Sequence, residues 1–171
     1  GTWHGLRPVL VDGSGCSMPD TPALQAHFGQ PSNQSPGCGF PVAHLLAAFD
    51  ADSGLILDLQ VAPMRTHDMA QVSKIHPSLR VGDLLVADRA FSSFFHLVIL
   101  HHRGVQICMR VHQNRIVNFR PRRRSADQVA DADRRGRPTS RWVRSLGKHD
   151  QIVEWVKPPE APAWMSAEPY D

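Results

Sequence analysis

The pattern of apolar and polar residues along the chain predicts a sheet that begins with antiparallel strands. Residues 9–11 form a short apolar run that ends at Asp12, after which glycines and prolines interrupt regular structure. Segments 40–49 and 55–62 flank a turn sequence, and the second of them carries apolar residues at every other position. We therefore expect 8–12, 40–49 and 55–62 to form a three-stranded antiparallel meander.

The segments that follow predict a helix and then a strand–helix–strand unit. Residues 66–75 start with Thr66, a suitable N-cap, and carry apolar residues at helical spacing. Residues 84–87 form a compact apolar run, 91–104 have the length of a helix ending in glycine, and 105–111 form another apolar run. A strand, a helix and a strand in this order imply parallel pairing through a right-handed crossover. The expected fold class is therefore α/β, with a mixed sheet.

The sequence changes character beyond residue 115. Arginine-rich polar sequence leads into two short apolar segments, 141–146 and 151–158, which we expect to be strands. We accordingly expect two domains: a core over residues 1–114 and a basic, β-rich insertion subdomain over residues 115–171.

Composition narrows the class of protein. No stretch reaches the roughly 18 consecutive apolar residues that a membrane-spanning helix requires. The three cysteines show no Cys-x-x-Cys spacing, which argues against a disulfide framework and against a zinc finger. We therefore expect a cytoplasmic protein without a membrane partner.

The charge is distributed unevenly. Residues 1–100 hold five Lys and Arg against eight Asp and Glu, a net charge of −3, whereas residues 101–171 hold fourteen against eight, a net charge of +6. One short run in the second part contains four arginines: Arg120, Arg122, Arg123 and Arg124. Such a run is either a solvated loop or a contact surface for nucleic-acid phosphates.

Two aspartates stand out as candidate chemistry because each ends an apolar strand. Asp12 follows Val-Leu-Val and Asp88 follows Leu-Leu-Val-Ala. If the two strands are parallel neighbours, their carboxyl ends share one edge of the sheet and the two carboxylates converge. A divalent cation or a shared proton then relieves the repulsion, and oxygen ligands favour Mg²⁺ or Mn²⁺ and phosphoryl transfer. Strand-end aspartates also cap turns, and spacing alone leaves both interpretations open.

Several ordered blocks resemble the catalytic domain of DDE transposases of the IS4 family. The blocks are GLRPVLVDGSGCSMPDTPALQAHFGQ, GCGFPVAHLLAAFDADSGLILDLQVAP, GDLLVADRAFSSF and RGVQICMRV, and the resemblance covers roughly residues 3–114, continuing more loosely through DQIVEWVKP. It implies a ribonuclease-H-like fold in which the first and fourth strands are central neighbours. It also implies that Asp12 and Asp88 are the first two catalytic aspartates.

The resemblance carries further implications for cofactor and partners. Asp12 and Asp88 would hold two Mg²⁺ or Mn²⁺ ions in the complete enzyme, which would cleave DNA at transposon ends and join the freed 3′-hydroxyl to a target. The partners would be double-stranded DNA with terminal inverted repeats and a second copy of the enzyme in a synaptic complex on the nucleoid. Arg89 and the run Arg120, Arg122, Arg123 and Arg124 would contact DNA, although a structural ion pair is an equal alternative for Arg89.

The sequence departs from the family pattern in one important respect. The family's third carboxylate is a glutamate within Tyr-x₂-Arg-x₃-Glu-x₆-Lys, and this pattern is absent here. The three glutamates present, Glu154, Glu160 and Glu168, lie in a strand-like stretch or among prolines. We therefore expect a fragment that is inactive alone. The alternatives are a non-catalytic DNA-binding or dimerising module derived from a transposase, and a metal-dependent nuclease or phosphatase of the same fold.

Overall fold

The computed structural model describes residues 1–32, 35, 37–66, 68–111, 140–148, 150–155 and 157–158. Its internal contacts divide the chain into two units, Gly1–Arg110 and Val111–Asp171. The elements of the first unit are β1 (Arg7–Ser17), α1 (Pro22–Phe28), β2 (Val42–Asp50), β3 (Ile56–Pro63), α2 (Asp68–Ile75), the 3-10 helix η1 (His76–Ser78), β4 (Asp83–Ala87), the 3-10 helix η2 (Arg89–Phe91), α3 (Phe94–His102) and β5 (Gln106–Met109).

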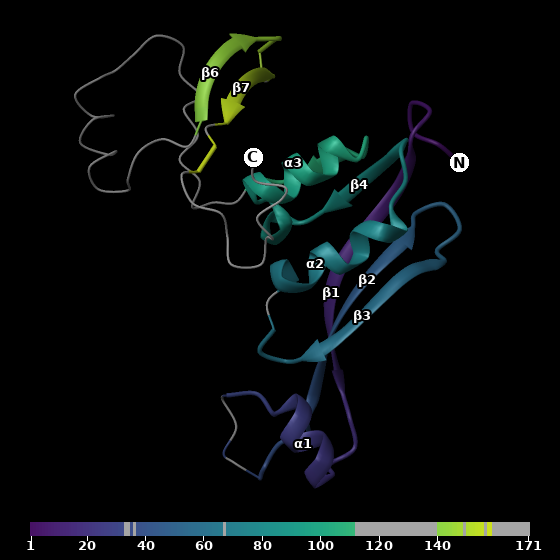
Figure 1. The fold of residues 1–171 in the computed structure, drawn as a ribbon, viewed down its shortest axis with the longest axis vertical. Coiled ribbons are helices and arrows are strands. Elements are labelled where there is room, and N and C mark those ends of the chain that lie inside the picture. Colours follow the sequence, from purple (N-terminus) through teal and green to yellow (C-terminus); the bar gives the residue numbers. More distant parts are fainter. Residues whose placement is uncertain are drawn as a thin grey trace, which may run out of the picture. The chain divides into compact units, whose positions relative to one another are not determined.

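A five-stranded mixed sheet forms the centre of the first unit, with the strand order β3-β2-β1-β4-β5 (Figure 1). The strands β1, β2 and β3 pair antiparallel, which confirms the meander expected from the sequence. The strands β1, β4 and β5 pair parallel, which confirms the strand–helix–strand unit. The first and fourth strands are therefore neighbours at the middle of the sheet.

Strand β1 is longer than the sequence predicts. The expected break after Asp12 is wrong, because the strand continues through Ser17. Residues 13–17 pair with residues 42–46 of β2, and this partner supplies hydrogen bonds that the glycine-rich sequence does not suggest. Glycine and small polar residues lower strand propensity, but pairing with a neighbouring strand overrides that local preference.

The helices begin later than the sequence predicts. Helix α2 starts at Asp68, not directly after Thr66, a shift within the usual uncertainty of helix ends. The single helix expected over 91–104 is instead η2 followed by α3, because the Ser93 side chain accepts a hydrogen bond from the His96 amide and caps α3 there. Gly104 follows the last turn with a φ of 71°, the left-handed conformation that glycine adopts readily after a helix.

The hydrophobic core lies on one face of the sheet. Helices α2 and α3 both contribute to it, and Phe91 of η2 is 1% exposed within it. Its fully buried members include Val9 and Val11 of β1, Leu46 and Ala48 of β2, Leu85 of β4, Val72 and Ile75 of α2, and Leu100 of α3. Burying such side chains stabilises the fold by about 1.5–3 kcal/mol each.

The other face of the sheet is partly open. Leu59 and Val61, which belong to the alternating apolar positions of β3, are 45% and 52% exposed, and Leu10 of β1 is 42% exposed. The period of two correctly predicted a strand. Among the alternating positions of β3, Leu57 packs against the core, whereas the exposed Leu59 and Val61 are not part of it.

In the second unit, the strands among the described residues form a hairpin. Strands β6 (Ser140–Ser145) and β7 (Gln151–Trp155) pair antiparallel, as expected for 141–146 and 151–158. The division into a core over 1–114 and an insertion subdomain over 115–171 stays a prediction.

Two histidines stack inside the first unit. His76 of η1 and His96 of α3 are 2% and 0% exposed, their ring centroids are 5.0 Å apart, and their planes differ by 4°. Burial lowers the pKa of His76 to about 3, with His96 and Arg103 acting in the same direction. Burial also lowers the pKa of His96, and its hydrogen bond to the Phe91 carbonyl partly offsets this effect. Both rings are therefore neutral in the folded protein at pH 7.

The histidine pair predicts how stability depends on pH. The unfolded chain takes up a proton on each ring as pH falls through 6.5, whereas the folded protein does so only at lower pH. Because of His76, the free energy of unfolding should be level above pH 7 and fall between pH 6.5 and about pH 3, by up to about 1.4 kcal/mol per pH unit. His96 should add to this fall below pH 6.5. Urea unfolding at a series of pH values measures this slope.

Two variants separate the histidine pair from other titrating groups. His76→Phe keeps an aromatic ring in the stack and should reduce the slope by about one proton. Leu55→Ala changes an exposed side chain that does not titrate and should leave the slope unchanged. An identical slope in His76→Phe and the parent protein would contradict the assignment.

Candidate active site beside the parallel pair β1 and β4

The register of β1 and β4 brings the two sequence-predicted aspartates to neighbouring positions. The parallel ladder runs from the pair Arg7 and Asp83 to the pair Val11 and Ala87. Asp12 is the next residue after Val11 in β1, and Asp88 is the next residue after Ala87, where β4 ends. Because paired strands lie about 4.8 Å apart, two residues at matched positions beside the ladder are close together.

Both aspartates lie on the face of the sheet opposite the core. Val11 is buried in the core and Ala87 packs against it. Successive side chains of a strand alternate between the two faces, so the residues after Val11 and Ala87 turn toward the open face. Asp12 and Asp88 are indeed exposed. The fold therefore presents two carboxylates together at a solvent-accessible edge.

Each aspartate side chain also accepts a hydrogen bond from a backbone amide close to it in sequence. Asp12 Oδ1 accepts a hydrogen bond from the Gly13 amide at 2.9 Å. Asp88 caps η2, with Oδ1 accepting from the Ala90 amide at 2.6 Å. The cap interpretation of strand-end aspartates thus applies to Asp88, and it leaves the second carboxylate oxygen, Oδ2, available for a ligand.

The described residues do not contain a complete metal cluster. No group of three or more His, Cys, Asp or Glu side chains in that part of the chain is arranged to hold an ion. Glu154 lies on β7, in the second unit, as the strand-like sequence predicted. Glu160 and Glu168 lie outside the described residues. The two carboxylates at β1 and β4 are hard oxygen ligands of the kind that Mg²⁺ and Mn²⁺ prefer.

A partly buried ion pair that the sequence analysis missed joins these two strands at a matched position of their register. Arg7 Nε and Nη2 donate to Asp83 Oδ1 and Oδ2, both at 2.8 Å. The Asp83 side chain is 3% exposed and the Arg7 side chain 24% exposed. Arg7 lies five residues before Asp12, and Asp83 lies five residues before Asp88. The sequence does contain this signal, an Arg and an Asp at equal distances before the two candidate ligands.

The electrostatics of Asp83 follow from its surroundings. Burial by itself raises the pKa of Asp83, but the bidentate hydrogen bonds from Arg7 and a hydrogen bond from the Arg80 amide lower it, and the pKa lies below its ordinary value. Arg7 also approaches Asp50 at the end of β2, with Nη1 3.8 Å from Oδ2. One guanidinium thus joins the ends of three adjacent strands.

The predicted DNA contacts are only partly within the described residues. Arg89 is exposed and belongs to η2, next to Asp88. The run Arg120, Arg122, Arg123 and Arg124 lies outside the described residues. Arg89 is thus next to Asp88 in sequence, and its contact with DNA, like that of the arginine run, stays a prediction.

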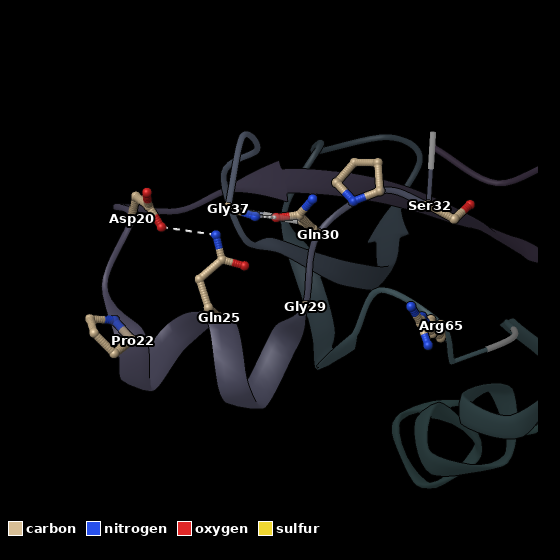
Figure 2. Close-up of a pocket in the computed structure, with 9 residues that line it drawn as sticks. Asp20, Pro22, Gln25, Gly29, Gln30, Ser32, Gly37 and Arg65 are labelled. Atoms are coloured by element: carbon tan, nitrogen blue, oxygen red, sulfur yellow. Dashed lines mark hydrogen bonds between the residues drawn. The ribbon is translucent and has the colours of Figure 1, made fainter. Parts of the chain in front are cut away.

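A pocket of about 730 Å³ lies at the carboxyl end of β1, beside α1 (Figure 2). Asp20, Gln25, Gln30 and Arg65 are among the residues that line it, whereas Asp12 and Asp88 are not. Some of its polar groups hydrogen-bond to one another: Gln25 donates to Asp20 Oδ1 at 2.8 Å, and Gln30 accepts from the Gly37 amide at 3.3 Å. The pocket is therefore separate from the candidate site at Asp12 and Asp88.

Comparison with known proteins identifies the family. The model of the transposase DDE domain matches residues 3–158, so the chain belongs to the family of transposase DDE domains. Among solved structures, the cryo-EM structure of piggyBac transposase in a synaptic complex with hairpin DNA is similar at 16% identity and a TM-score of 0.46, covering 80% of this chain. This chain spans 28% of the length of that transposase chain. No curated protein matches. Across the described residues, no helix is both long and apolar enough to cross a membrane.

The Arg7–Asp83 pair predicts an asymmetric response to mutation. Arg7→Met leaves the buried Asp83 carboxylate without its cation and should lower the free energy of unfolding by about 3 kcal/mol at pH 7. Asp83→Asn leaves a half-buried guanidinium that still reaches Asp50, and should cost less. Urea unfolding of both variants measures the difference.

The double variant and a surface control complete this test. Arg7→Met/Asp83→Asn should cost less than the two single changes added together, since no unpaired buried charge is left. Arg110→Met removes an exposed arginine and should change stability by less than about 0.5 kcal/mol. Additive costs in the double variant would show that the pair contributes nothing specific.

Proposed function

We propose that this chain forms part of the catalytic core of an IS4-like DDE transposase that cleaves and joins DNA by phosphoryl transfer. The observation that carries the proposal is the position of Asp12 and Asp88 at matched positions beside the central parallel pair β1 and β4. Membership of the transposase DDE domain family supports the same conclusion.

The strand order supports a ribonuclease-H-like fold for this core. Three antiparallel strands, followed by two strands that add in parallel on the other side of β1, give the order β3-β2-β1-β4-β5. The parallel ladder of β1 and β4 ends at Val11 and Ala87, and in open α/β sheets ligand groups collect where the parallel pairing ends, on the carboxyl side. The fold thereby brings together two aspartates that are 76 positions apart in the sequence.

Mg²⁺ or Mn²⁺ fits the donor set of Asp12 and Asp88. The two carboxylates are exposed, lie on one face and repel each other unless a cation lies between them. Two such ions, when bound, supply Lewis-acid stabilisation of the attacking and leaving oxygens in phosphodiester cleavage and transfer. Asp12 and Asp88 would hold them, and a third carboxylate from outside the described residues would complete the site. We infer that the chain alone is a fragment of this site and inactive in transposition.

The proposed partners follow from the chemistry and from the charge. Arg89 lies beside Asp88, and the part of the chain after residue 100 carries the net positive charge. We propose that Arg89 and the run Arg120, Arg122, Arg123 and Arg124 contact the phosphates of transposon ends and target DNA. In the complete enzyme, two copies would hold the two transposon ends in a synaptic complex on nucleoid DNA.

Metal binding tests the proposed site directly. The chain should bind Mn²⁺, seen by paramagnetic relaxation of water protons or by calorimetry. Asp12→Asn and Asp88→Asn should each weaken binding by about tenfold or more, because each removes one charged ligand. Asp20→Asn, which changes an exposed aspartate in the pocket at the carboxyl end of β1, should have no effect. Identical Mn²⁺ binding in the parent chain and in Asp12→Asn/Asp88→Asn would refute the site.

A second candidate function is non-catalytic DNA binding. The observation that favours it is the incomplete metal cluster in the described part of the chain, together with the net charge of +6 after residue 100. Such a module would bind DNA through its arginines without cutting it.

DNA binding distinguishes the two functions. A fluorescently labelled duplex should bind with an affinity that falls as salt rises, and neutralising Arg120, Arg122, Arg123 and Arg124 should reduce the log–log salt slope by about 3–4. For a purely binding module, Asp12→Asn and Asp88→Asn leave affinity unchanged with and without Mn²⁺. For the transposase core, Mn²⁺ raises affinity in the parent chain and not in these variants. Cleavage of plain DNA by this chain would instead favour a metal-dependent nuclease.

A further inference from the structure

We propose that His96 is a positioning residue for Asp88, acting through the main-chain carbonyl of Phe91. The proposal rests on the proposed function for the role of Asp88 itself. Its structural basis is a hydrogen bond that joins the turn after Asp88 to the first turn of α3.

The backbone that follows Asp88 forms one tight turn. Asp88 Oδ1 accepts from the Ala90 amide at 2.6 Å, and the Asp88 carbonyl accepts from the Phe91 amide at 3.3 Å. The direction of the Asp88 side chain is thus coupled to the conformation of residues 89–91. Whatever holds Phe91 in place also limits how the Asp88 carboxylate can turn.

His96 holds the carbonyl end of this turn. Its ring is 0% exposed, and Nδ1 lies 2.8 Å from the Phe91 carbonyl oxygen. A carbonyl oxygen can only accept, so Nδ1 carries the proton. Nε2 is then unprotonated, and it has no hydrogen-bond partner among the described residues. The geometry therefore assigns His96 a single, neutral tautomer.

Two contacts fix the His96 ring itself. The ring stacks on His76 from η1, and the His96 amide donates to the Ser93 side chain at the start of α3. Of the charged groups near the stack, Arg103 at the end of α3 disfavours a proton on His76. Stacking on His76 and the hydrogen bond from Nδ1 to the Phe91 carbonyl together hold the neutral His96 ring against η1.

The role of His96 goes beyond filling space. The Phe91 side chain is already anchored in the core at 1% exposed, and the Ser93 amide also donates to the Phe91 carbonyl, at 2.9 Å. These contacts hold the turn to the core, whereas the hydrogen bond from His96 fixes the direction of the carbonyl from the side of α3.

His96→Phe removes the donor while keeping ring volume. His96→Asn supplies a donor close to the position of Nδ1.

The first measurement uses the unmodified chain. Long-range ¹H–¹⁵N correlation NMR should show His96 with a protonated Nδ1 and an unprotonated Nε2 at pH 7. A protonated Nε2 with an unprotonated Nδ1, or a doubly protonated ring, would overturn the proposal without any variant being made.

The second measurement follows the turn in the variants. In His96→Phe, amide hydrogen exchange of Ala90 and Phe91 should speed up by about tenfold relative to Ala48 in β2, which reports global stability. His96→Asn should restore most of the protection. A uniform change across Ala48, Ala90 and Phe91 would show a general structural role and overturn the proposal.

The third measurement connects the turn to the proposed site. Mn²⁺ affinity should fall by about three- to tenfold in His96→Phe and recover in His96→Asn, a smaller effect than for groups that touch a metal ligand directly. If the parent chain binds no Mn²⁺ while exchange at Ala90 and Phe91 responds as expected, the proposed function fails and the hold of His96 on the Asp88 turn stands. If the parent chain binds Mn²⁺ and His96→Phe leaves both affinity and exchange unchanged, the positioning role fails and the proposed function stands.

Discussion

A single partly buried ion pair sets the alignment on which the candidate site depends. Arg7 and Asp83 face each other across the parallel strands β1 and β4, joined by two hydrogen bonds of 2.8 Å. Any other register of these strands would separate the two charges, leaving a carboxylate that is 3% exposed without a cation. A one-residue slip would turn every side chain of a strand to the opposite face, but a two-residue slip would keep the faces, and the ion pair disfavours that alternative. The ion pair supplies the specificity, and the aspartates five positions further along are aligned as a result.

The alternation of side chains along β1 and β4 places the core residues and the candidate ligands on opposite faces of the sheet. Val11 and Ala87 turn toward the helices and the core, while the next residues, Asp12 and Asp88, turn toward the open face. Substitutions at the aspartates consequently remove little packing, and the core can be tight without enclosing the ligands. The turn after Asp88 connects the core to the candidate site, because Phe91 is part of the core and its carbonyl is hydrogen-bonded to His96.

Sequence patterns predicted the strands, their antiparallel and parallel pairing and the neighbouring positions of Asp12 and Asp88, because local periodicity and strand-ending residues carry that information. They failed where long-range partners decide the outcome. The extension of β1 to Ser17 depends on pairing with residues 42–46 of β2, and Gly13 and Gly15 argue locally against it. The Arg7–Asp83 pair joins segments far apart in sequence, and its equal spacing from the two aspartates becomes a signal only once the strands are known to be parallel neighbours. No local pattern reveals the His76–His96 stack. The start of α3 depended on whether Phe91 continued the helix or entered the core, a choice that tertiary packing makes.

The equal spacing from Arg7 to Asp12 and from Asp83 to Asp88 limits how such a domain can change in length. Inserting or deleting one residue in either five-residue stretch would slide one carboxylate by about 3.3 Å and turn it to the opposite face. The connections between the strands carry no such restriction, since the ion pair re-establishes the alignment whatever length of chain lies between them. Evolutionary change in length should therefore concentrate in segments such as the loop between α1 and β2, and spare the two short stretches that lead to the aspartates.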